Sequence, residues 1–168
     1  MKVTIVGAGK SGIAAAKLAK KLNYQVSLSE SKASSDFENE IEILKSLNIK
    51  YEFSGHSSKF LKSSDLVVTS PGVPPKNLII KEAEHKGIPI ISELEFGWRH
   101  LKNKSIAITG TNGKTTTTSL IAFILNNSGK KAIACGNIGT PISDLYGNID
   151  DDTILVIEAS SYQLDRIV

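Results

Sequence analysis

The stretch Ile5–Gly12, written IVGAGKSG, decides how the first part of the chain is expected to fold. A β-branched run precedes its three glycines, Gly7, Gly9 and Gly12, and a helical pattern follows them. This G-x-G-x-x-G spacing is typical of a tight strand-to-helix turn whose backbone approaches a pyrophosphate at the helix N-terminus. Glu30 ends the next predicted strand, where such sites often carry an acid that binds ribose. The residues alone are typical of an NAD site and favour a ligand with a pyrophosphate, but they do not specify the nucleoside; a plain turn that binds nothing is the alternative.

Short β-branched runs alternate with helical patterns along the chain, which predicts βαβ units and parallel sheets. In the first part we expect strands at 2–7, 25–30, 50–53, 66–69 and 89–91, and helices at 11–22, 37–47 and 77–86. A helical bridge at 93–101, packed through Phe96 and Trp98, precedes further strands at 106–109, 131–135 and 153–158 and a helix at 115–127. We therefore predict an α/β protein, with a Rossmann-like parallel-sheet domain over 1–93 and the first part of a P-loop-type α/β domain over 94–168.

The composition excludes several classes of protein. With 40% hydrophobic and 22% charged residues among 168, the chain is an ordinary globular protein. Cys135 is the single cysteine, so no internal disulfide can form, and we expect it to pack in the core. No apolar stretch approaches the roughly 20 residues that cross a bilayer, and no secretory signal follows Met1, so we expect a cytoplasmic protein without membrane contact.

The net charge and the histidines indicate little about binding partners or functional sites. A net charge of +3 with lysines scattered along the sequence gives no reason to expect a nucleic-acid partner. His56, His85 and His100 have no partner at a recognisable spacing, so we expect solvated or structural roles for them.

A second glycine-rich loop, ITGTNGKTTTT at Ile108–Thr118, also follows a predicted strand and opens a helix. Backbone N–H groups of Gly110–Gly113 can cradle phosphate oxygens, the Lys114 ammonium can neutralise the β and γ phosphates, and the Thr115 hydroxyl can ligate Mg²⁺. The loop departs from the common pattern because its isoleucine stands where the first glycine would be. Glu158 ends the apolar strand TILVIE and is a candidate Mg²⁺ ligand beside this loop. These residues predict a site for a nucleoside triphosphate.

Several segments, in this order, resemble the Mur ligase family: TGTNGKTTT of the second loop, GNIG at Gly136–Gly139, and EASSYQL at Glu158–Leu164. SPGV at Ser70–Val73 and SELE at Ser92–Glu95 are similar to segments in the first domain of the members that add D-glutamate, so the resemblance covers the whole chain. It implies an ATP-dependent acid–D-amino-acid ligase of peptidoglycan synthesis that uses ATP and Mg²⁺. The implied substrates are UDP-N-acetylmuramoyl-L-alanine and D-glutamate, and the implied state is a monomer.

The resemblance also implies roles for individual residues. In this family the Rossmann-like domain binds the UDP of the sugar substrate and no nicotinamide, while the second loop binds ATP. The implied ATP-binding residues are Gly110, Thr111, Asn112, Gly113, Lys114, Thr115 and Thr116. The implied substrate-binding residues are Ser11, Gly12, Glu30, Ser31, Lys32, Ser70, Pro71, Gly72, Asn137, Ser160 and Gln163. Lys114 and Glu158 are the implied catalytic residues, and Thr115 and Glu158 the implied Mg²⁺ ligands.

The implied reaction is formation of an acyl phosphate at the L-alanyl carboxylate, followed by attack of the D-glutamate amine. The family's later histidine, its carbamylated lysine and its third domain would lie beyond Val168, so we expect this 168-residue chain alone not to complete ligation. Two alternatives are an NAD-dependent oxidoreductase and a nucleotide-sensing Rossmann module. Both rest on the first loop and leave TGTNGKTTT without a use.

Overall fold

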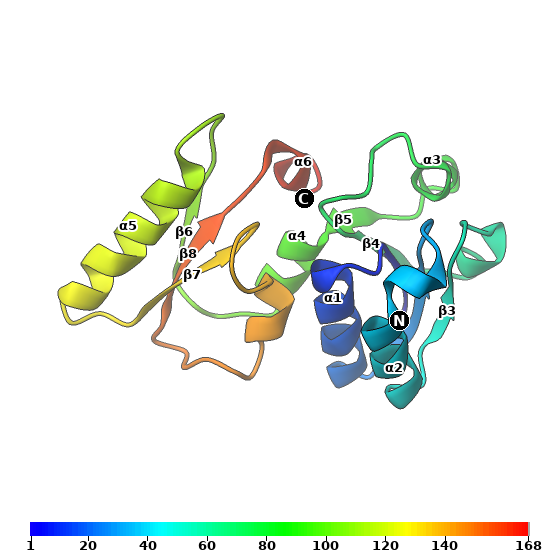
Figure 1. Cartoon of the computed structure of the whole chain (residues 1–168), viewed down its shortest axis with the longest axis horizontal. Helices are drawn as coiled ribbons and strands as arrows, with labels where there is room; N and C mark the ends of the chain where they lie inside the picture. The colour runs from blue at the N-terminus through cyan, green and yellow to red at the C-terminus, as the bar shows by residue number, and fades with distance from the viewer. Residues whose placement is uncertain (168) are drawn as a thin grey trace.

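The structure, a computed structural model, describes residues 1–167, which form two α/β units lying side by side (Figure 1). The first unit is a five-stranded parallel sheet in the order β3-β2-β1-β4-β5. Its strands are β1 (Lys2–Val6), β2 (Gln25–Ser29), β3 (Lys50–Glu52), β4 (Leu66–Thr69) and β5 (Ile90–Ser92). Its helices are α1 (Lys10–Lys21), α2 (Glu38–Ser46) and α3 (Leu78–His85), with short 3-10 turns η1 (Ser34–Asp36) and η2 (Ser58–Phe60).

Both faces of this first sheet are covered, because successive side chains of a strand point to opposite faces. Val3 and Ile5 of β1 pack with α1 and α2 on one face, whereas Val6 packs with α3 on the other. The strand order reverses between β1 and β4, and in open α/β sheets ligands bind beyond the carboxyl ends of the strands at such a point. The IVGAGKSG turn follows β1 at this position.

The second unit is a three-stranded parallel sheet in the order β6-β8-β7. Its elements are β6 (Ser105–Ile108), α5 (Lys114–Asn127), β7 (Ala132–Gly136), the 3-10 turn η3 (Ile142–Leu145), β8 (Ile154–Glu158) and the short helix α6 (Ser161–Leu164). Because β8 is central, Glu158 at its end lies in register with Ile108 on one side and Gly136 on the other. The loops that follow β6 and β7 therefore both reach Glu158.

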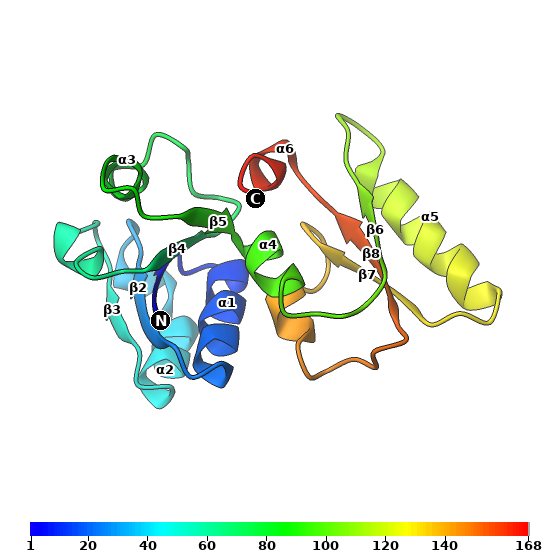
Figure 2. The ribbon, with the colours of Figure 1, turned by 180° about the vertical axis from the view of Figure 1, so that it is seen from behind.

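Helix α4 (Glu93–Trp98) joins the two units. Its Phe96 packs in the core of the first unit, and its Leu94 packs in the core of the second. In Figures 1 and 2, α4 lies between the sheets, with α1 and the orange turn η3 beside it. A Cβ atom on Gly97 would lie 2.6 Å from the Ser143 nitrogen, so α4 and η3 approach as closely as a glycine permits.

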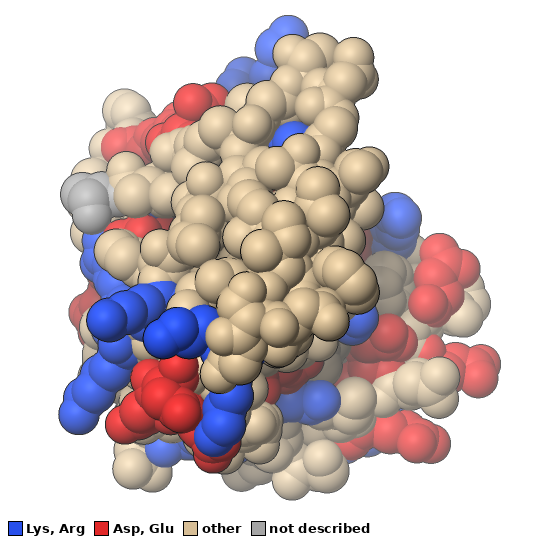
Figure 3. Space-filling view, turned by 90° about the vertical axis from the view of Figure 1, so that its left-hand side faces the viewer, with Lys and Arg blue, Asp and Glu red and all other residues tan. Residues whose placement is uncertain are grey.

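The outer face of the second unit exposes several apolar side chains. Leu120, Phe123 and Ile124 of α5 are each more than half exposed, and Ile106 of β6 is 39% exposed. Figure 3 shows this side of the molecule as a broad surface with few charged side chains. Within residues 1–167 no helix is both long and apolar enough to cross a membrane.

The α/β architecture predicted from the sequence is confirmed. Each expected strand is present with ends shifted by one residue at most. The bridge helix is shorter than expected and ends at Trp98. Phe96 and Cys135 are buried as predicted, but the expectation for Trp98 was wrong: it is 43% exposed, and its indole N–H donates to the Ser105 hydroxyl. The division of domains at residue 93 stays a prediction, since α4 packs on both units.

Candidate active site

Glycine stands at the three positions of the first loop for different physical reasons. A Cβ on Gly7, whose φ is +100°, would lie 2.9 Å from the Ser70 hydroxyl, and one on Gly12 would lie 1.9 Å from the Gly7 carbonyl oxygen. These two glycines are therefore needed for strand, helix and neighbouring loop to pack together. A Cβ on Gly9 would have no neighbour within 4 Å in the described part of the chain. Gly9 is also the N-cap of α1 and offers no side chain to its first-turn N–H groups, which leaves a helix N-terminus suited to an anion.

A cavity of about 410 Å³ lies beyond this helix N-terminus. It brings together most of the residues predicted to bind the UDP-substrate: Ser11, Glu30, Ser31, Lys32, Ser70, Pro71, Gly72 and Asn137. Gly12 is buried behind this surface and is not part of the described lining. Because Asn137 follows β7, the cavity of the first unit is closed by a residue of the second unit.

Glu30 organises the loops around this cavity. One carboxylate oxygen accepts the Ala8 N–H at 2.8 Å, and the other accepts the Lys32 N–H at 2.9 Å and the Ser31 hydroxyl at 3.1 Å. Burial alone would raise the pKa of Glu30, but these hydrogen bonds together hold it below its ordinary value. Glu30 is therefore ionised at neutral pH, and its carboxylate ties the glycine loop to the segment that carries Lys32.

His56 is a residue of this cavity that sequence reasoning missed, and the expectation of a solvated or merely structural role did not anticipate its place in the lining. Its Nδ1 lies 2.7 Å from the Ser29 hydroxyl, and its Nε2 lies 2.9 Å from the Asn77 side-chain nitrogen. Burial lowers the pKa of His56 more than the nearby carboxylates of Glu30 and Glu52 raise it. The imidazole is therefore neutral at pH 7 and oriented by two neighbours. No local sequence signal could have placed it there.

The second glycine loop also forms a helix N-terminus. Gly110 and Gly113 have φ values of +145° and +77°, and Gly113 is the N-cap of α5. The Lys114 ammonium folds back over the loop and donates to the carbonyl oxygens of Gly110 and Thr111 at 2.8 and 3.2 Å. The other predicted members, Asn112, Thr115 and Thr116, are exposed on the same turn. The backbone and Lys114 thus provide donors and a positive charge at one point.

Glu158 connects the two loops. Its Oε2 accepts the Thr115 hydroxyl at 2.7 Å, and its Oε1 accepts the Asn137 side-chain N–H at 2.9 Å. Its side chain is buried, with the residue 2% exposed. The sequence-based assignment of Glu158 depended on a pairing with Lys114 and Thr115. The contact with Thr115 is present, whereas the Lys114 ammonium donates to the carbonyl oxygens of its own loop. One carboxylate meets both the helix of the second glycine loop and the loop that closes the first cavity.

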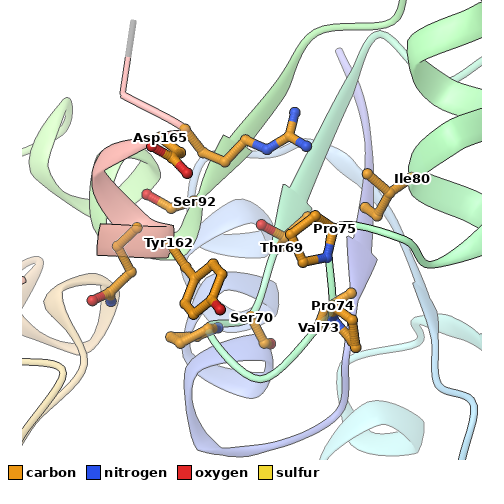
Figure 4. A pocket seen from close by; sticks show the side chains of 12 residues that line it. Thr69, Ser70, Val73, Pro74, Pro75, Ile80, Ser92, Tyr162 and Asp165 are labelled. Carbon is orange, nitrogen blue, oxygen red and sulfur yellow. The ribbon is translucent and has the colours of Figure 1, made fainter. Parts of the chain in front are cut away.

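Ser160 and Gln163 form a capping box at the start of α6. The Ser160 hydroxyl accepts the Gln163 N–H at 3.3 Å, and the Gln163 side-chain oxygen accepts the Ser160 N–H at 2.9 Å. Gln163 is 1% exposed, and its side-chain nitrogen has no hydrogen-bond partner within residues 1–167. It lines a second cavity of about 250 Å³ between the loop after β4 and α6, toward which Tyr162 extends (Figure 4). Ser160 does not line either cavity among the described residues, so its side chain serves the cap.

Five lysines gather in a hollow at the opposite edge of the first sheet, where the sequence had indicated scattered charges. They are Lys2, Lys20, Lys50, Lys59 and Lys62. This hollow includes the amino ends of strands and lies away from both glycine loops. It adds nothing to the candidate site.

Comparisons with known proteins agree with this arrangement. Residues 1–92 match the family described as Mur ligase MurD-like, N-terminal domain, and residues 108–167 match the Mur ligase middle domain. The chain belongs to the Mur ligase family. UDP-N-acetylmuramoylalanine--D-glutamate ligase of Koribacter versatilis is 42% identical over 166 residues, which are 99% of this chain and 37% of that relative. The protein of the same name from Thermoanaerobacter sp. is 41% identical over 166 residues, with the same two shares.

Solved Mur ligase structures share the fold. UDP-N-acetylmuramate-alanine ligase MurC from Thermotoga maritima matches 95% of this chain and 37% of its own with a TM-score of 0.55 at 25% identity. A murein peptide ligase from Psychrobacter arcticus matches 96% of this chain and 39% of its own with a TM-score of 0.59 at 22% identity. The chain thus spans a little over a third of the length of the relatives that it matches.

The residues around Glu158 fit a Mg²⁺ ion of the kind that ATP-dependent Mur ligases generally use. A carboxylate oxygen and a hydroxyl oxygen 2.7 Å apart, from Glu158 and Thr115, are hard donors of the type that Mg²⁺ prefers. No cluster of three or more His, Cys, Asp or Glu side chains able to hold a metal occurs within residues 1–167. Mg²⁺ is usually bound through one or two carboxylates, with phosphate oxygens and water as further ligands.

Proposed function

We propose that this chain contributes the UDP-substrate site and the ATP loop of a ligase that adds D-glutamate to UDP-N-acetylmuramoyl-L-alanine in peptidoglycan synthesis. One observation supports the proposal most strongly: Glu158 bonds to Thr115 and to Asn137 at once. With ATP on the second loop and the UDP-linked substrate in the first cavity, these contacts would bring the phosphate end of ATP and the far end of the substrate to the same carboxylate. The names of the relatives that are about 40% identical support D-glutamate as the second substrate.

The first cavity suits a uridine diphosphate. The diphosphate would lie at the N-terminus of α1, close to Gly9 and Ser11, with the Lys32 ammonium nearby for charge. Glu30 and Ser31 would face the uridine, and the turn Ser70–Gly72 would contact the linker toward the sugar. Asn137 and the buried Gln163 would meet the sugar-peptide part, for which Gln163 has a free side-chain N–H.

The second loop suits phosphate transfer to a carboxylate. Both the L-alanyl carboxylate and the γ-phosphate are anionic, so their approach needs positive charge, which the Lys114 ammonium supplies. Mg²⁺, when bound at Thr115 and Glu158, would neutralise further phosphate charge. A carboxylate oxygen would bond to the γ-phosphorus as ADP leaves. The D-glutamate nitrogen would then bond to the acyl carbon, and phosphate and a proton would leave.

Calorimetric titration of the chain with UDP-N-acetylmuramoyl-L-alanine, beside a titration with NADH, tests this proposal. Saturable heat with the UDP-sugar and none with NADH is expected. Binding of NADH alone would overturn the proposal and favour an oxidoreductase, and so would a UDP-sugar affinity unaffected by Lys32→Ala or Gly72→Val. Membership of the family also leads us to propose a cytoplasmic monomer, which sedimentation analysis would check.

A further inference from the structure

Glu93 is a buried carboxyl group that the proposed chemistry does not use. It opens α4, is 1% exposed, and accepts the Ser143 backbone N–H at 2.8 Å from a position 50 residues earlier in the chain. Its second oxygen and the Ser143 hydroxyl are both buried without a hydrogen-bond partner among residues 1–167. A buried carboxyl with an open oxygen is destabilising, and natural proteins keep such features chiefly where function needs them.

Helix α4 and the turn η3 pack closely beside the hydrogen bond between Glu93 and the Ser143 N–H. A Cβ on Gly97, one turn after Glu93, would lie 2.6 Å from the Ser143 nitrogen and 2.8 Å from the Ile142 carbonyl carbon. Pro141, the N-cap of η3, provides no side-chain cap. The Ser143 N–H at the start of η3 therefore has no acceptor from a capping side chain of η3 itself. The Glu93 carboxyl group of α4 provides that acceptor.

The turn η3 follows directly after the loop Gly136–Thr140, and this loop meets both binding sites. The Asn137 N–H donates to the Glu158 carbonyl oxygen at 2.9 Å, and its side chain donates to the Glu158 carboxylate. On the other side, the Lys10 ammonium donates to the Gly139 carbonyl oxygen at 2.6 Å. The loop is thus fixed at its start by β8 and at its end by η3, which Glu93 holds.

We propose that Glu93 is a positioning residue of the active site: by holding η3 against α4, its carboxyl group fixes the loop that places Asn137 between Glu158 and the first cavity. The functional meaning of this position rests on the proposed function. The physical coupling between Glu93 and Asn137 does not, since it is a property of the chain without ligand.

Hydrogen exchange followed by NMR on the 168-residue chain tests the coupling residue by residue. Glu93→Ala should speed exchange of the Asn137 amide by about tenfold or more, because local opening becomes easier, while the Ile5 amide in β1 exchanges as before. Glu93→Gln keeps an acceptor for the Ser143 N–H and should restore slow exchange at Asn137. If Glu93→Ala does not fold, Glu93→Asp is used in its place. Its carboxyl group is one methylene farther from the Ser143 N–H, so exchange of the Asn137 amide should again become faster.

Gly97→Ala provides a second perturbation of the same contact and should also speed exchange at Asn137. Faster exchange at Ser143 with unchanged exchange at Asn137 would overturn the proposal, because Glu93 would then hold η3 alone. Equal acceleration at Ile5 and Asn137 would overturn it too, as a general loss of stability. A chain with the expected exchange pattern that fails to bind UDP-N-acetylmuramoyl-L-alanine would instead contradict the proposed function.

Discussion

Replacing Glu93 by glutamine should change how stability depends on pH. Burial, with a smaller contribution from nearby Asp144, raises the pKa of this carboxyl from 4.5 to about 7, even though the hydrogen bond from the Ser143 N–H acts in the opposite direction. The folded chain therefore binds this proton more tightly than the unfolded chain. The resulting stabilisation is fully present below pH 4.5 and is lost as the pH rises through about 7.

The size of the effect follows from the same two values. Each pKa unit corresponds to about 1.4 kcal/mol, so the difference between 4.5 and about 7 corresponds to about 3 kcal/mol of unfolding free energy. Wild type should thus lose about 3 kcal/mol relative to Glu93→Gln between pH 4.5 and pH 8. The Cys135 thiol also interacts with Glu93, but burial raises its pKa to about 12, so it stays neutral throughout this range.

Urea unfolding at several pH values between 4.5 and 8 measures this difference. Trp98, the single tryptophan, lies on the same helix and reports on its unfolding, while circular dichroism reports on both units. Contributions of other groups are common to both proteins and cancel in the comparison. If the difference in unfolding free energy between the two proteins stays constant across this range, Glu93 titrates alike in the folded and unfolded states and its pKa is not raised by burial.

Three further substitutions test the local geometry. Gly12→Ala should lower the free energy of unfolding in urea by about 2–4 kcal/mol, because the new Cβ would lie 1.9 Å from the Gly7 carbonyl oxygen. Gly9→Ala is the control: its Cβ would have no neighbour within 4 Å among the described residues, so it should lower the free energy of unfolding by less than about 1 kcal/mol. Lys114→Met should change unfolding by less than about 0.5 kcal/mol but weaken Mg·ATP binding about tenfold or more in calorimetry, and equal affinity would exclude a phosphate contact. Ser160→Ala should lose about 1 kcal/mol of stability with the capping box, and an unchanged midpoint would show that the cap is dispensable.

Local patterns were sufficient to predict much of this structure. The strand, glycine turn and helix at Gly7 and at Gly113 follow from neighbouring residues, because turn geometry and helix starts are decided within a few positions. Glu158 could be placed beside Thr115 since parallel strands bring their carboxyl ends to one edge. The function-bearing loops were therefore visible in the sequence.

Contacts between segments that are distant along the chain could not be predicted from the sequence. His56 enters the first cavity from an irregular segment after β3, where no periodicity fixes the direction of a side chain. Glu93 meets Ser143 across 50 residues, through a 3-10 turn that has no strong sequence signal. Ser160 and Gln163 are a different case, because their S-x-x-Q spacing is a local signal for the capping box that starts α6, although resemblance assigned both residues to substrate. The contact between Glu93 and Ser143 depends on how the two units dock, which apolar periodicity does not encode.

NMR chemical-shift mapping on the 168-residue chain, with UDP-N-acetylmuramoyl-L-alanine and with Mg·ATP in separate titrations, would show whether each glycine loop binds its own nucleotide. We expect the UDP-sugar to shift the amides of Ser11, Lys32 and Gly72, and Mg·ATP to shift those of Gly113 and Thr115. Shifts by both ligands at the same loop, or shifts at the first loop by Mg·ATP alone, would contradict the assignment of one loop to each nucleotide.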